Sequence, residues 1–274
     1  MFLNISYRME GEYIMKFNYK MIETKKENNV FRITLNRPDT HNALEKQMLD
    51  ELELAILEAD QNNEIKAITI QGAGDKAFAS GANINQLRDK KPLEALVPGM
   101  QELYKKIENC SKVTIAVVNG FALGGGCELA LASDIRIVTN TAKLGFPELN
   151  LGIIPSAGGT QRLSRIIGKG RALDMILTGK IINGDESERI GLASYVVNVN
   201  ELEDKIQEVI KKTLEKGPIA TYLAKKAIHK GFDLDQDAAM WIEKLSQTVI
   251  FGTEDKQEGT TAFLEKRKAE FKNK

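Results

Sequence analysis

The sequence predicts an α/β fold followed by a helical C-terminal region. Up to about residue 198, short β-rich segments alternate with segments of helical periodicity. From about residue 199 onward, only helical patterns occur. Strands that alternate with helices favour a mainly parallel sheet covered by helices. We therefore expect one compact α/β body and a helical region that acts either as a lid or as an assembly module.

The α/β part contains four predicted strands, rich in β-branched and aromatic residues, at residues 30–36, 67–71, 113–118 and 134–139. After the first of them, apolar residues from Leu44 to Ala59 recur at helical spacing and predict a helix. Asn42 and Glu45 at its start resemble a capping pair. A further helical pattern precedes the last of the four strands.

The C-terminal region begins with an amphipathic helix predicted over residues 202–214. We expect Asn200 to open this helix and Gly217-Pro218 to close it. Three more helical stretches are predicted, at residues 219–230, 235–251 and 255–268. These patterns divide the chain into an N-terminal extension of uncertain start (1–16), an α/β core (17–198) and a helical region (199–274).

Composition restricts the class of protein. The chain of 274 residues has 38 basic and 38 acidic residues, and it is 42% hydrophobic and 28% charged, as in ordinary globular proteins. A balanced charge argues against a protein that binds duplex DNA, which needs a basic face. The apolar stretch at 113–132 is interrupted by polar residues and glycines, so it is a poor membrane span.

The two cysteines, Cys110 and Cys127, are too few for a disulfide framework and lack the spacing of metal ligands. They fit a reducing compartment. The first residues are partly acidic and lack the apolar core of a signal peptide. We expect a cytoplasmic protein that binds neither membrane nor DNA.

Several catalytic mechanisms lack their motifs. The sequence has no phosphate-binding G-x-x-x-x-G-K-[ST], no H-E-x-x-H, no G-x-S-x-G and no C-x-x-C. His41 and His229 are the only histidines, and we interpret both as surface or packing residues. No metal site and no cofactor are predicted.

The most informative segment is 119–130, NGFALGGGCELA. A predicted strand leads into Gly124, Gly125 and Gly126, and a helix follows. Glycines allow close approach of a ligand or another backbone, and the first N–H groups of a helix lack partners within it. They can stabilise a developing oxyanion, although three glycines also occur in a simple tight turn. The small residues of segment 76–83 form a second candidate donor loop.

Two carboxylates are candidates for acid–base chemistry. Glu128 lies on the first turn of the glycine-led helix, and Glu148 follows Gly145-Phe146-Pro147. Each alone reads as a solvated charge. Together they could hold a water molecule, one accepting its proton while the other delivers a proton. The Gly-rich turn at 152–162 opens another helix, and a phosphate cradle is a further interpretation there.

Taken together, these segments resemble the enoyl-coenzyme A hydratase/isomerase (crotonase) family. The similarity covers AFASGANI, AVVNGFALGGGCELA, GFPELNLGIIPSAGGTQRL and AFLEKRKAEF, in the family's order and spacing from about residue 17 onward. It implies a spiral of ββα repeats with a helical C-terminal trimerisation region, usually assembled as a hexamer of two trimers. The substrate would be an acyl-coenzyme A thioester, with coenzyme A as part of the substrate.

Residue by residue, the resemblance places an oxyanion hole at the backbone N–H groups of Ala82 and Gly125. Glu128 and Glu148 match the two catalytic glutamates of hydratases. The implied reaction is addition of water across a 2,3-enoyl thioester, in which Glu148 protonates C2 and Glu128 orients and deprotonates the water.

The resemblance also implies coenzyme contacts at Asn83, Ile84 and Asn85, and at Phe263 and Lys266, which would reach a neighbouring subunit's coenzyme. Three positions depart from the common hydratase pattern. Asn83 replaces Asp, Asn85 replaces a Lys found in some members, and Ser156 replaces Gly.

Alternative functions on the same fold are a double-bond isomerase and an acyl-coenzyme A thioester hydrolase. A non-catalytic, RNA-binding member is a more distant alternative, disfavoured by the neutral charge. Acyl chain length and pathway are left open. Fatty-acid β-oxidation, butyrate-type fermentation and amino-acid breakdown all use such enzymes.

Overall fold

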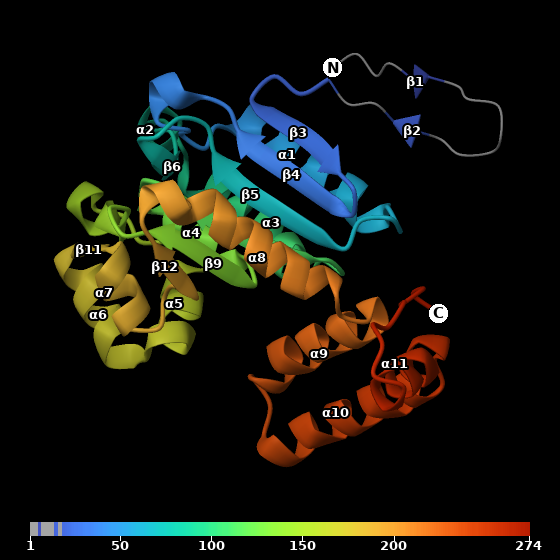
Figure 1. Ribbon diagram of the computed structural model, residues 1–274. Helices are drawn as coiled ribbons and strands as arrows, with labels where there is room; N and C mark the ends of the chain where they lie inside the picture. The colour runs from blue at the N-terminus through green and yellow to red at the C-terminus, as the bar shows by residue number, and fades with distance from the viewer. Residues whose placement is uncertain (1–4, 7–13, 16–17) are drawn as a thin grey trace.

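The structure is a computed structural model that describes residues 5–6, 14–15 and 18–274. The predicted extension over residues 1–16 lies outside the described residues, except for β1 (Ile5–Ser6) and β2 (Ile14–Met15), which pair antiparallel. The α/β core and the helical region both lie within the described part of the chain (Figure 1).

A large sheet forms the centre of the described molecule. Its spatial order is β12-β9-β7-β5-β4-β3, and all neighbours are parallel except the antiparallel pair β3–β4. The strand bounds are β3 (Ile22–Glu27), β4 (Val30–Leu35), β5 (Ala67–Gly72), β7 (Val113–Val118), β9 (Ile135–Thr139) and β12 (Tyr195–Val197). The four predicted strands are therefore confirmed as β4, β5, β7 and β9.

Both faces of this sheet are covered by helices, because successive side chains point to opposite faces and those of β7 are buried throughout. On β7, Val113, Ile115 and Val117 pack against α8 (Leu202–Leu214). The intervening Ala116 and Val118 face the main core on the other side. That core is covered by α1 (Lys46–Gln61), α3 (Met100–Asn109) and α4 (Gly125–Ala132) (Figure 1).

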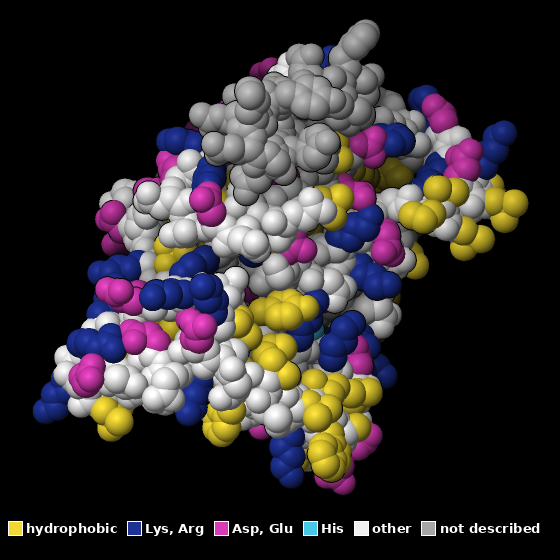
Figure 2. All heavy atoms as spheres, turned by 90° about the vertical axis from the view of Figure 1, so that its right-hand side faces the viewer, with side chains coloured by type: hydrophobic (Ala, Val, Ile, Leu, Met, Phe, Trp, Pro, Cys, Tyr) yellow, Lys and Arg dark blue, Asp and Glu magenta, His cyan; other side chains and the backbone are white. Residues whose placement is uncertain are grey.

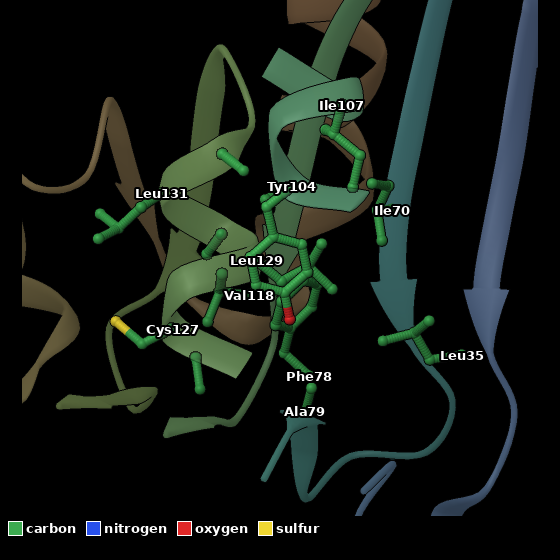
Figure 3. Close-up of a cluster of buried hydrophobic side chains, with 14 of the residues drawn as sticks. Leu35, Ile70, Phe78, Ala79, Tyr104, Ile107, Val118, Cys127, Leu129 and Leu131 are labelled. Carbon is green, nitrogen blue, oxygen red and sulfur yellow. The ribbon is translucent and has the colours of Figure 1, made fainter. Parts of the chain in front are cut away.

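Figure 3 shows the part of the core that supports the glycine-led helix. Tyr104 and Ile107 come from α3 and lie between α4 and the strands, while Cys127 and Leu131 point from α4 away from α3. Every residue of α4 is buried, so this helix is fixed on all sides. Both cysteines are buried and free.

A second, smaller sheet has the order β11-β10-β8-β6. Its bounds are β6 (Ala77–Ala79), β8 (Phe121–Leu123), β10 (Lys143–Gly145) and β11 (Ile181–Asn183). β6, β8 and β10 are mutually parallel, and β11 is antiparallel to β10. Because carboxyl ends of parallel strands lie at one edge of a sheet, the segments that follow β6, β8 and β10 meet there.

Short helices connect these strands. The remaining bounds of the core are η1 (Pro38–Thr40), α2 (Ile84–Arg88), η2 (Pro92–Leu96), η3 (Pro147–Leu151), α5 (Gly159–Ile167), α6 (Lys169–Thr178), α7 (Gly184–Arg189) and η4 (Val199–Glu201).

The C-terminal region is helical, as predicted. It consists of α8 followed by α9 (Pro218–Gly231), α10 (Gln236–Phe251) and α11 (Glu254–Leu264), and α9–α11 extend away from the sheet (Figure 1). The last helix ends four residues earlier than the predicted limit at 268. Among the described helices, none has the length and apolar character needed to cross a membrane.

Two predicted helix caps are wrong. α1 begins at Lys46 after Glu45, which makes no side-chain capping bond. Asn42 is instead buried at φ = +53°, where its side chain bonds to the backbone of Arg37, Ala73 and Ala77. Likewise Asn200 does not cap α8, because it lies inside η4, which Asn198 caps.

Candidate active site

The loops after β6, β8 and β10 bring three predicted site segments to one edge of the small sheet. β6 leads to Gly81-Ala82, β8 leads to Gly124-Gly125, and β10 leads through Phe146 to Glu148. Gly81 therefore lies beside Gly125, and Gly124 lies beside Glu148. This topology is the reason that the candidate groups can act on one ligand.

Glu128 is buried on the first turn of α4 and is held by a turn from a distant segment. Its Oε1 accepts hydrogen bonds from the backbone N–H groups of Ala157 and Gly159, each at 2.7 Å. Burial raises the pKa of Glu128, and the two N–H donors oppose this rise. The two N–H groups thus orient the carboxylate through Oε1. Its other oxygen, Oε2, has no hydrogen-bond partner among the described residues.

Glu148 lies on η3, directly after Pro147. Its Oε2 is buried without a hydrogen-bond partner in the described part of the chain. Burial is the main cause that raises the pKa of Glu148 to about 7, and the nearby carboxylate of Glu128 raises it further. The two carboxyl groups therefore interact electrostatically. Glu148 is the one that is partly protonated near neutral pH.

The backbone N–H groups of Ala82 and Gly125 belong to two segments that contact each other at Gly81. A methyl group at Gly81, whose φ is +99°, would stand 3.6 Å from the nitrogen of Gly125. Ala82 forms an isolated bridge with Leu44, which fixes its loop. Neither N–H has a hydrogen-bond partner among the described residues. Gly125 is the first residue of α4, where the helix dipole favours negative charge.

The glycines of the 124–126 run have separate structural roles. Gly124 has φ = +51° and leaves space for Glu148. A methyl group at Gly126 would stand 2.0 Å from the carbonyl oxygen of Ala79, so the glycine lets α4 pack directly on β6. The interpretation as a tight turn and the interpretation as a donor site are both compatible with this geometry.

The residues predicted to contact the coenzyme lie in two places, at the start of α2 and at the end of α11. Asn83 is the N-cap of α2 and its side chain accepts the N–H of Asn85 at 3.0 Å, while Ile84 is exposed. Phe263 is 83% exposed near the end of α11, and Lys266 follows that helix. Figure 1 shows α11 far from α2 and α4, so Phe263 and Lys266 do not reach the site of their own chain.

The remaining sequence hypotheses can be assigned to particular contacts. The N–H groups of the 157–159 turn bind Glu128 rather than lying free for a phosphate. Ser156 does not have a positive φ, so its replacement of Gly leaves that turn intact. His41 is exposed, and His229 contacts Asp134 at 3.2 Å. Among the described residues, no cluster of three or more His, Cys, Asp or Glu could hold a metal.

Two site-supporting residues were missed by the sequence analysis. Tyr104, fully buried on α3, donates its hydroxyl to the carbonyl oxygen of Gly125 at 2.7 Å. Arg162 donates to the carbonyl of Ala157 at 3.0 Å, inside the turn that holds Glu128. The only signal for Arg162 was its place four residues after Gly158; nothing in the local sequence marks Tyr104.

This arrangement can perform acid–base chemistry beside a stabilised oxygen. One carboxyl group is held by N–H donors that favour its ionised form, and the pKa of the second, about 7, leaves it partly protonated near neutral pH. Two backbone N–H groups provide donors for a carbonyl oxygen that gains charge. Such a site suits the addition or removal of a proton and water next to a thioester or similar carbonyl.

Comparison with known proteins agrees with this chemistry. The family model for enoyl-CoA hydratase/isomerase matches residues 25–274. A short-chain-enoyl-CoA hydratase from Clostridium acetobutylicum is 41% identical over 263 residues, covering 95% of this chain and 100% of the relative. A crotonyl-CoA hydratase from Syntrophomonas wolfei is 43% identical over 258 residues, covering 93% of this chain and 99% of the relative.

Solved structures give the same result for the fold. A crystal structure of an enoyl-CoA hydratase subunit from Geobacillus kaustophilus matches with a TM-score of 0.90 and 37% identity, covering 93% of this chain and 99% of that one. An enoyl-CoA hydratase from Bacillus anthracis matches with a TM-score of 0.89 and 36% identity, covering 93% of this chain and 100% of that one. The predicted crotonase-type α/β fold with its helical C-terminal region is confirmed.

Proposed function

Because the chain belongs to the enoyl-CoA hydratase/isomerase family, we propose that it is an enoyl-CoA hydratase, a hydro-lyase that adds water reversibly across the 2,3 double bond of a 2-enoyl-coenzyme A. The product is the 3-hydroxyacyl-coenzyme A. The observation that carries this choice within the family is the pair of interacting carboxyl groups, buried Glu128 and half-buried Glu148. Hydration needs one group to take a proton from water and another to give a proton to carbon.

The first step is binding of the thioester carbonyl by the N–H groups of Ala82 and Gly125. Attack of water at C3 moves electron density through C2 onto the thioester oxygen, which becomes an enolate. Two fixed donors stabilise that charge, and removal of such a donor typically costs about 3 kcal/mol at a transition state. Since both donors are backbone groups, they are supplied by the loop geometry after β6 and β8.

The second requirement is balanced proton transfer. In the proposed mechanism Glu128, ionised and held through Oε1 by Ala157 and Gly159, uses Oε2 to accept a proton from the attacking water. Glu148, whose pKa of about 7 keeps it partly protonated, donates its proton to C2. One O–H bond of water and the C2–C3 π bond break, and one C–O bond and one C–H bond form. Glu128 ends protonated and Glu148 ionised, so one proton passes to solvent from Glu128 and one returns from solvent to Glu148 before the next turnover. No cofactor is required.

Short acyl chains are the proposed substrates. The support is the similarity to relatives named as short-chain-enoyl-CoA and crotonyl-CoA hydratases. A cytoplasmic location is proposed on the two free, buried cysteines.

Self-association to a trimer or hexamer is also proposed. The helical region exposes large apolar side chains, and Figure 2 shows hydrophobic side chains gathered on the lower, helical part of that face. The exposed large apolar side chains of α9 and α10 include Ile228, Met240, Trp241, Leu245, Val249 and Phe251. An exposed apolar surface of this kind marks an interface. In such an assembly, Phe263 and Lys266 could contact the coenzyme of a neighbouring subunit.

The direct test is loss of the enone ultraviolet absorbance when the purified protein is mixed with crotonyl-coenzyme A, with formation of 3-hydroxybutyryl-coenzyme A followed by chromatography. The proposal expects enzyme-dependent decay and the hydroxy product. Absence of decay with crotonyl and with longer enoyl chains would reject it. Free coenzyme A or a shifted double bond as the product would indicate the hydrolase or isomerase instead.

A further inference from the structure

Arg162 lies on α5, behind the turn that orients Glu128. Its Nη1 donates to the carbonyl oxygen of Ala157 at 3.0 Å, and the N–H of Ala157 donates to Glu128 Oε1. The same residue of the turn is therefore bonded on one side to the guanidinium and on the other to the carboxylate. A movement of Arg162 would be transmitted to Glu128 through the backbone of one residue, Ala157.

The turn is shaped to receive the guanidinium. Gly158 has φ = +107°, and a methyl group there would stand 2.0 Å from Arg162 Nη1. The space that a side chain would fill is occupied by the guanidinium. Gly159, the other donor to Glu128, is equally constrained, because a methyl group there would stand 2.9 Å from Glu128 Oε1.

Arg162 is itself held by a fork-shaped ion pair with Glu108 of α3. Nε donates to Oε1 at 3.1 Å and Nη2 donates to Oε2 at 3.0 Å, and both side chains are largely buried. A bidentate pair of this kind fixes the plane of a guanidinium. Nη1 remains to bond the turn. The side chain of Arg162 therefore links α3 to the turn that holds Glu128.

We propose that Arg162 is a positioning residue for the hydration reaction: clamped by Glu108, it fixes the 157–159 turn and thereby the reactive orientation of the Glu128 carboxylate. The proposal rests on the proposed function, because it assigns a purpose to the orientation of a catalytic base. Arg162 touches neither the water nor the thioester in this account.

The charges around Glu128 make this proposal separable from a merely structural role. The titratable groups that act on it or are acted on by it are Arg162 from α5, Glu148 from η3, Tyr104 from α3 and Cys127 from its own helix. Arg162 is the only cation among these four, and its charge lowers the pKa of Glu128. Removing that charge raises this pKa, whereas greater exposure of the carboxylate to solvent would lower it, because burial is the main cause of its rise.

The test compares R162Q, R162K and E108Q with R165Q. Arg165 is the matched control. It lies three residues after Arg162 on the same helix, but it is exposed and pairs with Asp233. Steady-state hydration of crotonyl-coenzyme A gives kcat, KM and the pH profile. Independently of activity, infrared difference spectra against E128Q follow the protonation of Glu128 in each background.

The expected results differ in sign between variants. R162Q lowers kcat by about 10- to 100-fold with KM changed little, as expected when a reactive group is displaced, and moves the titration of Glu128 and the acid limb of kcat/KM to higher pH. E108Q removes a negative charge, so it moves the titration of Glu128 and the acid limb of kcat/KM to lower pH. R162K keeps the charge and restores the titration, but it restores kcat only in part, because one ammonium cannot make all three contacts. R165Q behaves as wild type.

The proposal is overturned if folded R162Q matches R165Q in kcat, or if the titration of Glu128 is the same in wild type, R162Q and E108Q. Should R162Q fail to fold, E108Q and R162K decide the question by the same readouts. An inactive wild-type protein would reject the proposed function alone, and the infrared titration would still test the link between Arg162 and Glu128.

Discussion

The carboxylate of Glu148 rests against Gly124, so that a methyl group at Gly124 would stand only 2.8 Å from Glu148 Oε1. Gly124 ends the connection from β8 to α4, and its φ of +51° suits glycine. The first glycine of the run therefore serves both the backbone turn and the position of the proposed proton donor.

G124A is expected to lower kcat by about 100-fold, because the added methyl displaces the Glu148 carboxyl from the substrate. The measurement is steady-state hydration of crotonyl-coenzyme A together with a thermal melt. G191A is the matched control. Gly191 also has positive φ, at +84°, but a methyl group there meets open space. Equal loss of activity in both variants would attribute the effect to backbone strain.

The pH profile of the wild-type enzyme should be bell-shaped in the hydration direction. Glu128 must be ionised, so the rate rises as pH increases through its pKa, which burial places above the ordinary range. Glu148 must be protonated, so the rate falls as pH passes through about 7. E148D and E128D should shift the basic and acidic limbs respectively. A rate that keeps rising to pH 9 would contradict the assigned roles.

Glu148 should also make stability depend on pH. Because burial raises its folded-state pKa above the unfolded value, the folded state binds the extra proton between about pH 4.5 and 7, and its stability relative to the unfolded chain decreases as pH rises through that window.

E148Q should therefore unfold at a higher denaturant concentration than wild type at pH 8, by roughly 1 kcal/mol of unfolding free energy, and the difference should vanish below about pH 4, where the carboxyl is protonated in both the folded and the unfolded state. E102Q, which alters an exposed carboxylate on α3, is the control. A stabilisation that is equal at both pH values would show that ionisation of Glu148 is not its cause.

Tyr104 is predicted to support the donor loop. Y104F removes the buried hydroxyl that bonds to the carbonyl of Gly125 at 2.7 Å, which should cost about 1 kcal/mol of stability and lower kcat several-fold. Y195F, a change on the short edge strand β12, should have little effect on kcat. Denaturant unfolding and crotonyl-coenzyme A kinetics measure both quantities. An unchanged kcat in Y104F would show that the Tyr104 hydroxyl does not support the donor loop.

The fold was predictable where local pattern and environment agree. The strands at 30–35, 67–72, 113–118 and 135–139 are buried β-branched runs, and α1 and α8–α11 show clear helical periodicity. β3 was not predicted, because its sequence IETKKE is mostly polar and lies at the edge of the sheet. β6 is only three residues long, too short for any periodic signal.

The candidate residues of the site follow from sequence motifs, but the contacts that hold them in place do not. Glu128 and Glu148 were selected from motifs, yet each alone resembles a solvated charge. The burial of Glu128 depends on a turn some thirty residues later, and the role of Arg162 depends on Glu108 from another helix. Asn42 was misread for the same reason, since its positive φ and its bonds to residues 73 and 77 are set by tertiary contacts.

The central claim is that both glutamates act in the hydration of a 2-enoyl thioester. It is tested most directly by kcat for crotonyl-coenzyme A in wild type, E128Q and E148Q, with folding checked by thermal melts. The account predicts that each single variant loses about 10² or more in kcat while it stays folded. Retention of most of the wild-type rate by either variant, E128Q above all, would contradict the two-glutamate mechanism and point to an isomerase or hydrolase.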